Sequence, residues 1–124
     1  MIVETLAVGT ELLLGQIANT NAREIATRLA ESGLTHLNQA VVGDNATRME
    51  AAIRAAADRC DALIITGGIG PTADDITREA VAAVAGVPLV YDRAYEQALR
   101  ERWARMRPDL DFPESNLRQA YRPD

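Results

Sequence analysis

Three runs that predict strands, each stopped by a glycine and followed by a helical pattern, constrain the fold of this chain more than any other feature. The runs cover residues 2–8, 37–42 and 62–66, and a glycine follows each of them directly. The first run is rich in β-branched residues, which is typical of a strand buried on both faces of a sheet. Strands that alternate with helices predict an α/β domain with a parallel sheet.

Capping residues mark helices between these strands. Asn19 and its neighbours predict the start of a first helix that Gly33 closes, and Asp44-Asn45 predicts the start of a second, whose apolar stripe includes Cys60. After the third strand, we expect Asp74 or Asp75 to open a helix that ends at Gly86.

The remainder of the chain is less regular. Residues 88–91 predict a short extended piece, and Asp92 predicts the start of a long last helix that Pro108 ends. Residues 109–124 have room for a helical turn after Pro113 but show no further strand pattern. The 124 residues are expected to form one domain.

The loops after the three strands are the candidate site, because ligands of open parallel α/β sheets bind beyond the carboxyl ends of the strands. These loops are unusually polar. The candidate ligand-binding residues in them are Gly9, Thr10, Glu11, Asn19, Asn21, Thr66, Gly67, Gly68, Gly70, Pro71 and Thr72.

The loop after the third strand has the composition of an anion-binding loop. Its glycines free backbone amides just before a helix start, which is where phosphate groups bind in proteins. A tight turn that needs glycine for positive φ is an equally open explanation. A dinucleotide fingerprint is only partly matched, because Ala73 stands where the third glycine belongs, so a dinucleotide-dependent oxidoreductase ranks last.

Carboxylates beside this loop suggest a divalent metal. Asp74 and Asp75 would repel a bare phosphate, whereas Mg²⁺ is typically held by one or two carboxylates and the substrate phosphates. Asp44, at the end of another strand, is expected to join them on one ion. The alternative is that all three residues merely cap helices.

Composition excludes several other classes. The net charge is -5 and every basic residue is an arginine, which argues against nucleic-acid binding and against a lysine-dependent phosphate loop. No run reaches the roughly 20 apolar residues of a membrane span, and no signal peptide is seen, so we expect a cytoplasmic protein.

Conventional nucleophiles are scarce as well. Cys60 is the only cysteine and is expected to pack in the core, and His36, the only histidine, is expected at the surface. The two serines, Ser32 and Ser115, do not lie in nucleophile-elbow sequences. Any catalysis is therefore expected to use carboxylates, metal-activated water and backbone amides, which is phosphate or pyrophosphate chemistry.

Taken together, the loops resemble the signature of the CinA (competence/damage-inducible) amino-terminal domain and of the molybdopterin-binding domains of molybdenum cofactor biosynthesis, including MogA and MoeA. The resemblance runs from about Ile2 to Ala120. It rests on residues 8–17, 19–21, 42–45 and 66–72, followed by Asp75 and Thr77.

This resemblance implies a three-layer α/β/α domain with a mostly parallel, mixed sheet, a pterin or nucleotide site at the same loops, and assembly into dimers or trimers. It adds Thr77 to the ligand-binding residues and implies catalytic roles for Asp44 and Asp75. Because the family usually continues with another strand, the chain is expected to lack the last strand of the domain.

Two functions follow as expectations. The first is a metal-dependent pyrophosphatase, using Mg²⁺ or Co²⁺, that acts on ADP-ribose-like substrates. The second is a non-catalytic module that binds molybdopterin or an adenine nucleotide for assembly. Fold alone does not separate them.

Overall fold

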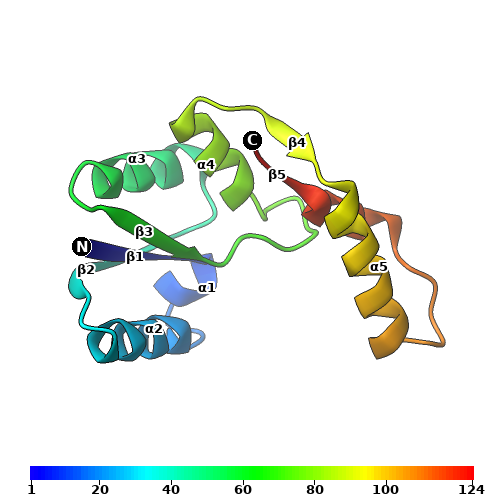
Figure 1. Cartoon of the computed structure of the whole chain (residues 1–124), viewed down its shortest axis with the longest axis horizontal. Coiled ribbons are helices and arrows are strands. Elements are labelled where there is room, and N and C mark those ends of the chain that lie inside the picture. The colour runs from blue at the N-terminus through cyan, green and yellow to red at the C-terminus, as the bar shows by residue number, and fades with distance from the viewer.

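The computed structural model describes residues 1–124, and its elements alternate as the sequence predicts (Figure 1). No helix in it is both long and apolar enough to cross a membrane. In chain order the elements are β1 (Ile2–Val8), α1 (Thr10–Leu13), α2 (Thr20–Glu31), β2 (Thr35–Val42), α3 (Ala46–Ala57), β3 (Ala62–Thr66), α4 (Thr77–Ala85), β4 (Leu89–Tyr91), α5 (Arg93–Met106), the 3-10 helix η1 (Glu114–Ala120) and β5 (Tyr121–Pro123).

The central sheet is parallel and has the order β2-β1-β3. β1 lies between the other two strands and is buried from Val3 to Val8, as its continuous apolar run predicts. Val8 pairs with Val42 and Ala7 with Thr66, so the three strands end at the same edge. This register brings the loops that follow the strands together.

Helices cover both faces of this sheet, which gives the expected three-layer α/β/α arrangement (Figure 1). α2 packs on one face, and α3 and α4 pack on the other. The main core lies on the second face and includes Leu6 and Val8 from β1, Met49 and Ile53 from α3, and Ala80 from α4. The periodicity of α3 is confirmed, since Met49, Ile53 and Ala56 are its buried residues.

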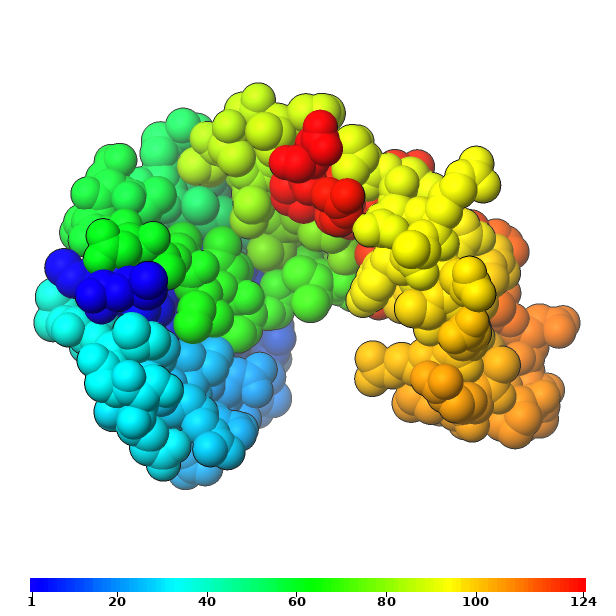
Figure 2. All heavy atoms as spheres, viewed as in Figure 1, coloured from blue at the N-terminus to red at the C-terminus, as the bar shows by residue number.

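The carboxyl-terminal part of the chain forms a separate arm. β4 and β5 pair in an antiparallel manner, and α5, which buries none of its residues, extends away from the central sheet. The arm has its own small cluster, in which Trp103 stacks edge-on against Phe112 and Arg100 lies over the Phe112 ring. Figure 2 shows the molecule hollowed between this arm and the body that carries the central sheet.

Sequence-based expectations about α4, Cys60 and the end of the chain need correction. α4 begins at Thr77 and not at Asp74 or Asp75, because residues 71–75 fold into a separate turn. Cys60 lies beyond the end of α3 and is only partly buried. The segment after Pro113 ends in a short strand, β5, which the pattern did not reveal because pairing with β4 stabilises it.

The expected caps of α2, α3 and α5 are confirmed. Asn19, Asn45 and Asp92 each accept a hydrogen bond from the backbone of the first helical turn that follows. Gly33 and Gly86 both take the left-handed conformation after their helices.

His36 does not lie free at the surface as expected, since its Nε2 lies 3.0 Å from the hydroxyl of Thr5 and its side chain is partly buried.

Candidate functional site

Glycines follow all three strand ends, and at the third the backbone of the neighbouring strand leaves no room for a side chain. The amide of Gly9 donates to the carbonyl of Val42 at 2.9 Å, which ties the end of β1 to the end of β2. Gly67 has φ 88°, and a Cβ built on it would stand 2.2 Å from the carbonyl oxygen of Val8. No other residue fits this position, so Gly67 holds the third loop against the end of β1.

Thr10 and Asp44 join the first two loops. The amide and the hydroxyl of Thr10 donate to Oδ2 of Asp44 at 3.3 and 3.2 Å, and the amide of Asp44 donates to the Thr10 hydroxyl at 3.0 Å. Asp44 Oδ1 makes no hydrogen bond to the protein. Asn45, and not Asp44, caps α3. The carboxylate of Asp44 is therefore not used to cap that helix.

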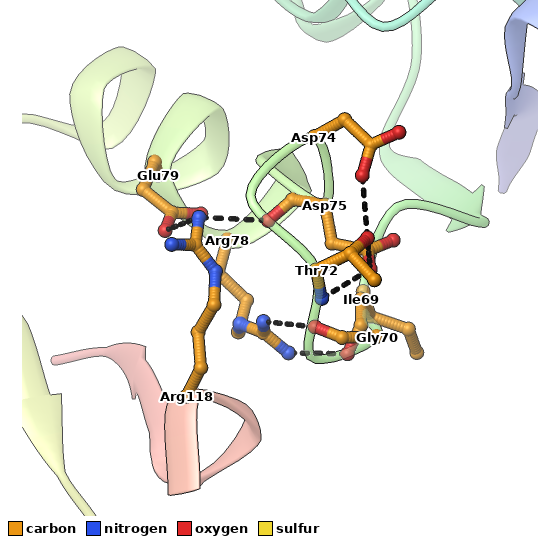
Figure 3. A network of polar contacts seen from close by, with 8 residues as sticks. All are labelled: Ile69, Gly70, Thr72, Asp74, Asp75, Arg78, Glu79 and Arg118. Carbon is orange, nitrogen blue, oxygen red and sulfur yellow. Dashed lines mark hydrogen bonds and ion pairs between the residues drawn. The ribbon is translucent and has the colours of Figure 1, made fainter. Parts of the chain in front are cut away.

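Asp75 stabilises the turn that precedes α4. Its Oδ2 accepts from the amide of Thr72 at 2.9 Å and from the hydroxyl of Thr72 at 2.6 Å, and the same hydroxyl lies 2.5 Å from Oδ1 of Asp74 (Figure 3). The hydroxyl bond, joined by the amides of Thr72 and Gly70, holds the pKa of Asp75 below its usual range. Asp75 is therefore an ionised carboxylate at neutral pH.

Thr77 anchors the glycine loop from inside the protein. Its side chain is buried, its hydroxyl donates to the carbonyl of Gly67 at 2.8 Å, and its amide donates to the carbonyl of Gly68 at 3.0 Å. A Cβ on Gly68 would stand 2.2 Å from the Thr77 hydroxyl, which explains the second glycine. In this structure the hydroxyl of Thr77 serves the loop.

A crevice of about 180 Å³ opens at the strand ends, where the sequence places the site. The Asn19 side chain is the notable polar group in it. Oδ1 of Asn19 caps α2 by accepting from Ala22, whereas Nδ2 is buried without a hydrogen-bond partner. Predicted site residues that line the crevice are Glu11, Asn19, Asn21, Thr66 and Gly67.

The remaining predicted residues lie on the surrounding loops and not in the crevice lining. Gly9 is buried at the strand end, and Thr10 with Asp44 forms the first pair described above. Gly70, Pro71, Thr72, Asp74 and Asp75 form the turn before α4.

The carboxylates do not come together as the sequence led us to expect. Asp74 and Asp75 meet on Thr72, while Asp44 is bonded to Thr10, and no group of three or more His, Cys, Asp or Glu side chains is placed to hold a metal. A cation here would therefore need most of its ligands from a bound molecule or water, which is how Mg²⁺ usually binds with phosphates.

Two arginines that sequence reasoning missed brace the glycine loop. Arg78 donates from its guanidinium to the carbonyls of Ile69 at 2.5 Å and Gly70 at 2.9 Å (Figure 3). Arg118, which comes from η1, donates to the backbone carbonyl of Asp75 at 3.1 Å and to Glu79 at 2.9 Å. No local pattern predicts these contacts, because Arg118 and Asp75 are distant in sequence.

Fold and site together define an α/β domain that presents glycine and carboxylate loops at the carboxyl edge of a parallel sheet. Residues 4–112 match the family described as "Probable molybdopterin binding domain". The chain belongs to this family, and the proteins it is similar to include some with CinA names.

Comparison with known proteins supports this membership. A "CinA-like protein" of Parasynechococcus marenigrum is 50% identical over 129 residues, which covers 98% of this chain and 28% of that protein. The crystal structure of a protein CinA "with unknown function" from Thermoplasma acidophilum superposes with a TM-score of 0.88 at 28% identity, covering 99% of this chain and 71% of that one.

More distant structures share the fold. The molybdopterin biosynthesis enzyme MoaB from Thermus thermophilus has a TM-score of 0.63 at 21% identity, with 95% of this chain and 70% of that chain covered.

The chain spans less than a third of the length of the curated relatives it matches, for example 29% of a relative from Bacillus cytotoxicus that is 48% identical.

Proposed function

We propose that this domain binds a phosphate-bearing pterin or adenine nucleotide at the strand-end loops, and that it cleaves the diphosphate of ADP-ribose-like substrates with a divalent metal. The observation that carries the proposal is the unpaired Nδ2 of Asn19, a buried donor that lines the crevice beside the glycine loop. A buried amide without a partner costs free energy, which a ligand oxygen would recover.

The size of the crevice limits which part of the ligand it holds. Pockets for whole small molecules usually measure about 300–1,000 Å³. The 180 Å³ crevice is smaller, so it accommodates one end of such a ligand. The rest of the molecule would extend over the loops that carry Asp44 and Asp75.

The carboxylates of Asp44 and Asp75 are suited to a divalent ion that is already bound to the substrate. Asp44 keeps Oδ1 available, and Asp75 is ionised, so each can offer an oxygen to an ion held mainly by diphosphate oxygens. Such an ion would neutralise the charge of the diphosphate. The protein's part is to fix the two carboxylates through Thr10 and Thr72 and to orient the substrate at the glycine loop.

A non-catalytic pterin- or nucleotide-binding module is the second candidate. The absence of a three-carboxylate cluster favours it, since the protein by itself does not build a metal cage. The relatives named for molybdopterin biosynthesis carry the same fold, and fold does not separate a binding module from an enzyme.

Thermal unfolding with ADP-ribose, with and without Mg²⁺ or Co²⁺, tests both candidates. A hundredfold excess of ligand over its Kd stabilises the folded state by about 2.7 kcal/mol. We expect stabilisation that needs the metal, together with release of AMP measured by chromatography. Stabilisation without AMP would leave the binding module as the function, and no stabilisation by ADP-ribose, AMP or a pterin phosphate would reject both.

A further inference from the structure

A second cavity, of about 460 Å³, lies between the glycine loop, the start of α5 and β5. Ile69 and Gly70 form one wall, and Tyr95, Arg102 and Tyr121 form the others. None of its lining residues borders the strand-end crevice. The cavity is therefore a separate place on the molecule, large enough for a small phosphorylated compound.

The charge of this cavity is opposite to that of the whole chain. Three guanidinium groups, of Arg78, Arg102 and Arg122, face a single carboxylate, that of Asp92, whereas the chain as a whole carries a net charge of -5. Asp92 pairs with Arg122 at 3.1 Å and cancels its charge. The charges of Arg78 and Arg102 remain.

Neither of these two arginines has a carboxylate within ion-pair distance. Arg78 is partly buried, and two of its five guanidinium N–H groups bond to the neutral carbonyls of Ile69 and Gly70. Asp75 lies close enough to interact with its charge without forming an ion pair. Arg102 makes no hydrogen bond or ion pair within the protein. Like charges held around one cavity repel each other, and a bound anion relieves that repulsion.

Aromatic rings flank the same cavity. Tyr95 is 49% exposed and Tyr121 is 44% exposed, although both are large side chains that usually bury more of their surface. Tyr121 is held edge-on against Tyr91, which fixes its position. Exposed rings beside arginines are suited to stack on a planar ring while the guanidinium groups bind phosphate.

We infer that this cavity is a second ligand site, which binds a phosphate monoester that carries a planar ring, such as a nucleoside monophosphate. Arg78 and Arg102 bind the phosphate, and Tyr95 contacts the ring. Arg78 also bonds to carbonyls of the glycine loop. An occupant of this cavity would therefore contact that loop on the side opposite the strand-end crevice.

AMP, inorganic phosphate and adenosine are suitable probes, measured by titration calorimetry on the whole chain without metal. We expect AMP to bind more tightly than phosphate, and adenosine to bind weakly. Arg102→Gln should raise the Kd for AMP about tenfold or more, since a lost charged hydrogen bond has that effect. Arg105→Gln, on the same helix but away from the cavity and with the same change in charge, should leave the Kd unchanged.

A second variant separates the ring from the phosphate. Tyr95→Leu should weaken AMP binding several-fold and leave phosphate binding unchanged. Arg102 and Tyr95 are surface residues, so both variants should fold, and circular dichroism checks this.

Three results would overturn the inference. The first is the absence of AMP binding by the unmodified chain at millimolar concentration. The second is an equal effect of Arg102→Gln and Arg105→Gln, which would indicate only general charge. The third is amide chemical-shift changes on AMP addition that are confined to Asn19 and its neighbours, with none at Gly70 or Tyr121, because AMP would then occupy the strand-end crevice alone.

Discussion

Thr10 and Asp44 bind each other across the ends of two parallel strands, through two hydrogen bonds to Asp44 Oδ2 and one from the Asp44 amide to the Thr10 hydroxyl. The contact joins residues 34 positions apart in sequence. It fixes the carboxylate of Asp44 at the sheet edge and leaves Oδ1 without a hydrogen bond to the protein. The first prediction depends on this pair.

Asp44→Asn should keep the fold and lose the proposed activity. The amide oxygen can still accept from Thr10, so the free energy of unfolding should change by less than about 1 kcal/mol. Metal-dependent release of AMP from ADP-ribose should fall by about a hundredfold or more, because a neutral amide is a poor ligand for Mg²⁺. Denaturant unfolding and a product assay measure the two effects, and a variant that keeps full activity would remove Asp44 from the site.

Asp75→Asn should show whether Asp75 only holds the loop in position or also takes part in the proposed reaction. Asparagine can accept one bond from Thr72, so the turn should persist with a stability change of about 1 kcal/mol or less. Activity should fall as it does for Asp44→Asn, and the double variant should lose little more, because both carboxylates would serve one ion. Additive losses would argue against a shared ion.

Gly67→Ala should unfold the loop region more severely than Gly15→Ala. Both glycines have positive φ, 88° and 69°, but a Cβ meets the Val8 carbonyl at 2.2 Å in the first and open space in the second. Gly15→Ala should cost about 1 kcal/mol from backbone strain, and Gly67→Ala should cost clearly more, about 3 kcal/mol or above. Urea unfolding curves provide the comparison, and equal costs would mean that contact with β1 is unimportant.

Glu4→Gln should lower the free energy of unfolding above pH 5. It should also make that free energy depend less on pH in acid. The Glu4 side chain is only 5% exposed, and its bonds to Arg59 lower its pKa below the usual 4.5. A pKa that is lower in the folded state than in the unfolded state gives stability that is present above pH 4.5 and is lost as the pH falls through the folded value.

A matched control for Glu4 is Glu50→Gln. Glu50 forms an exposed pair with Arg54 at 4.0 Å on α3, and its loss should change stability by less than about 0.5 kcal/mol. Thermal unfolding from pH 3 to pH 7 measures both variants. Equal behaviour of the two would show that burial of the Glu4–Arg59 pair does not matter.

The chain should form a dimer or trimer. β2 and β3 each pair only with β1, so each has a second edge that no strand of this chain covers, and Leu37 on β2 is 69% exposed. Unpaired strand edges and exposed apolar side chains favour association. Light scattering coupled to gel filtration measures the mass, and a strict monomer at high concentration would contradict the prediction.

Local features of the sequence determined the order and the ends of the main elements. Asn19, Asn45 and Asp92 begin helices because each can satisfy an amide a few residues away. Gly33 and Gly86 end helices because glycine accepts positive φ at no steric cost. These effects act within a few residues, so the sequence displays them directly.

The sequence also predicted that the polar loops after the strands meet at one edge of the sheet, because neighbouring parallel strands end at the same edge. Only the tertiary structure decided what the carboxylates do there. Asp75 bonds to Thr72 and not to the start of α4, and Asp44 bonds to Thr10 and does not form a three-carboxylate cluster with Asp74 and Asp75.

The roles of the arginines were likewise decided by packing. Arg118 reaches Asp75 across 43 positions, and Arg78 and Arg102 come to one cavity only because the arm places one side of α5 next to the glycine loop. A charged side chain on a helix surface has the same local pattern whether it faces solvent or a cavity. Its partner depends on how distant elements pack, and that information lies in the whole fold and not in any short segment.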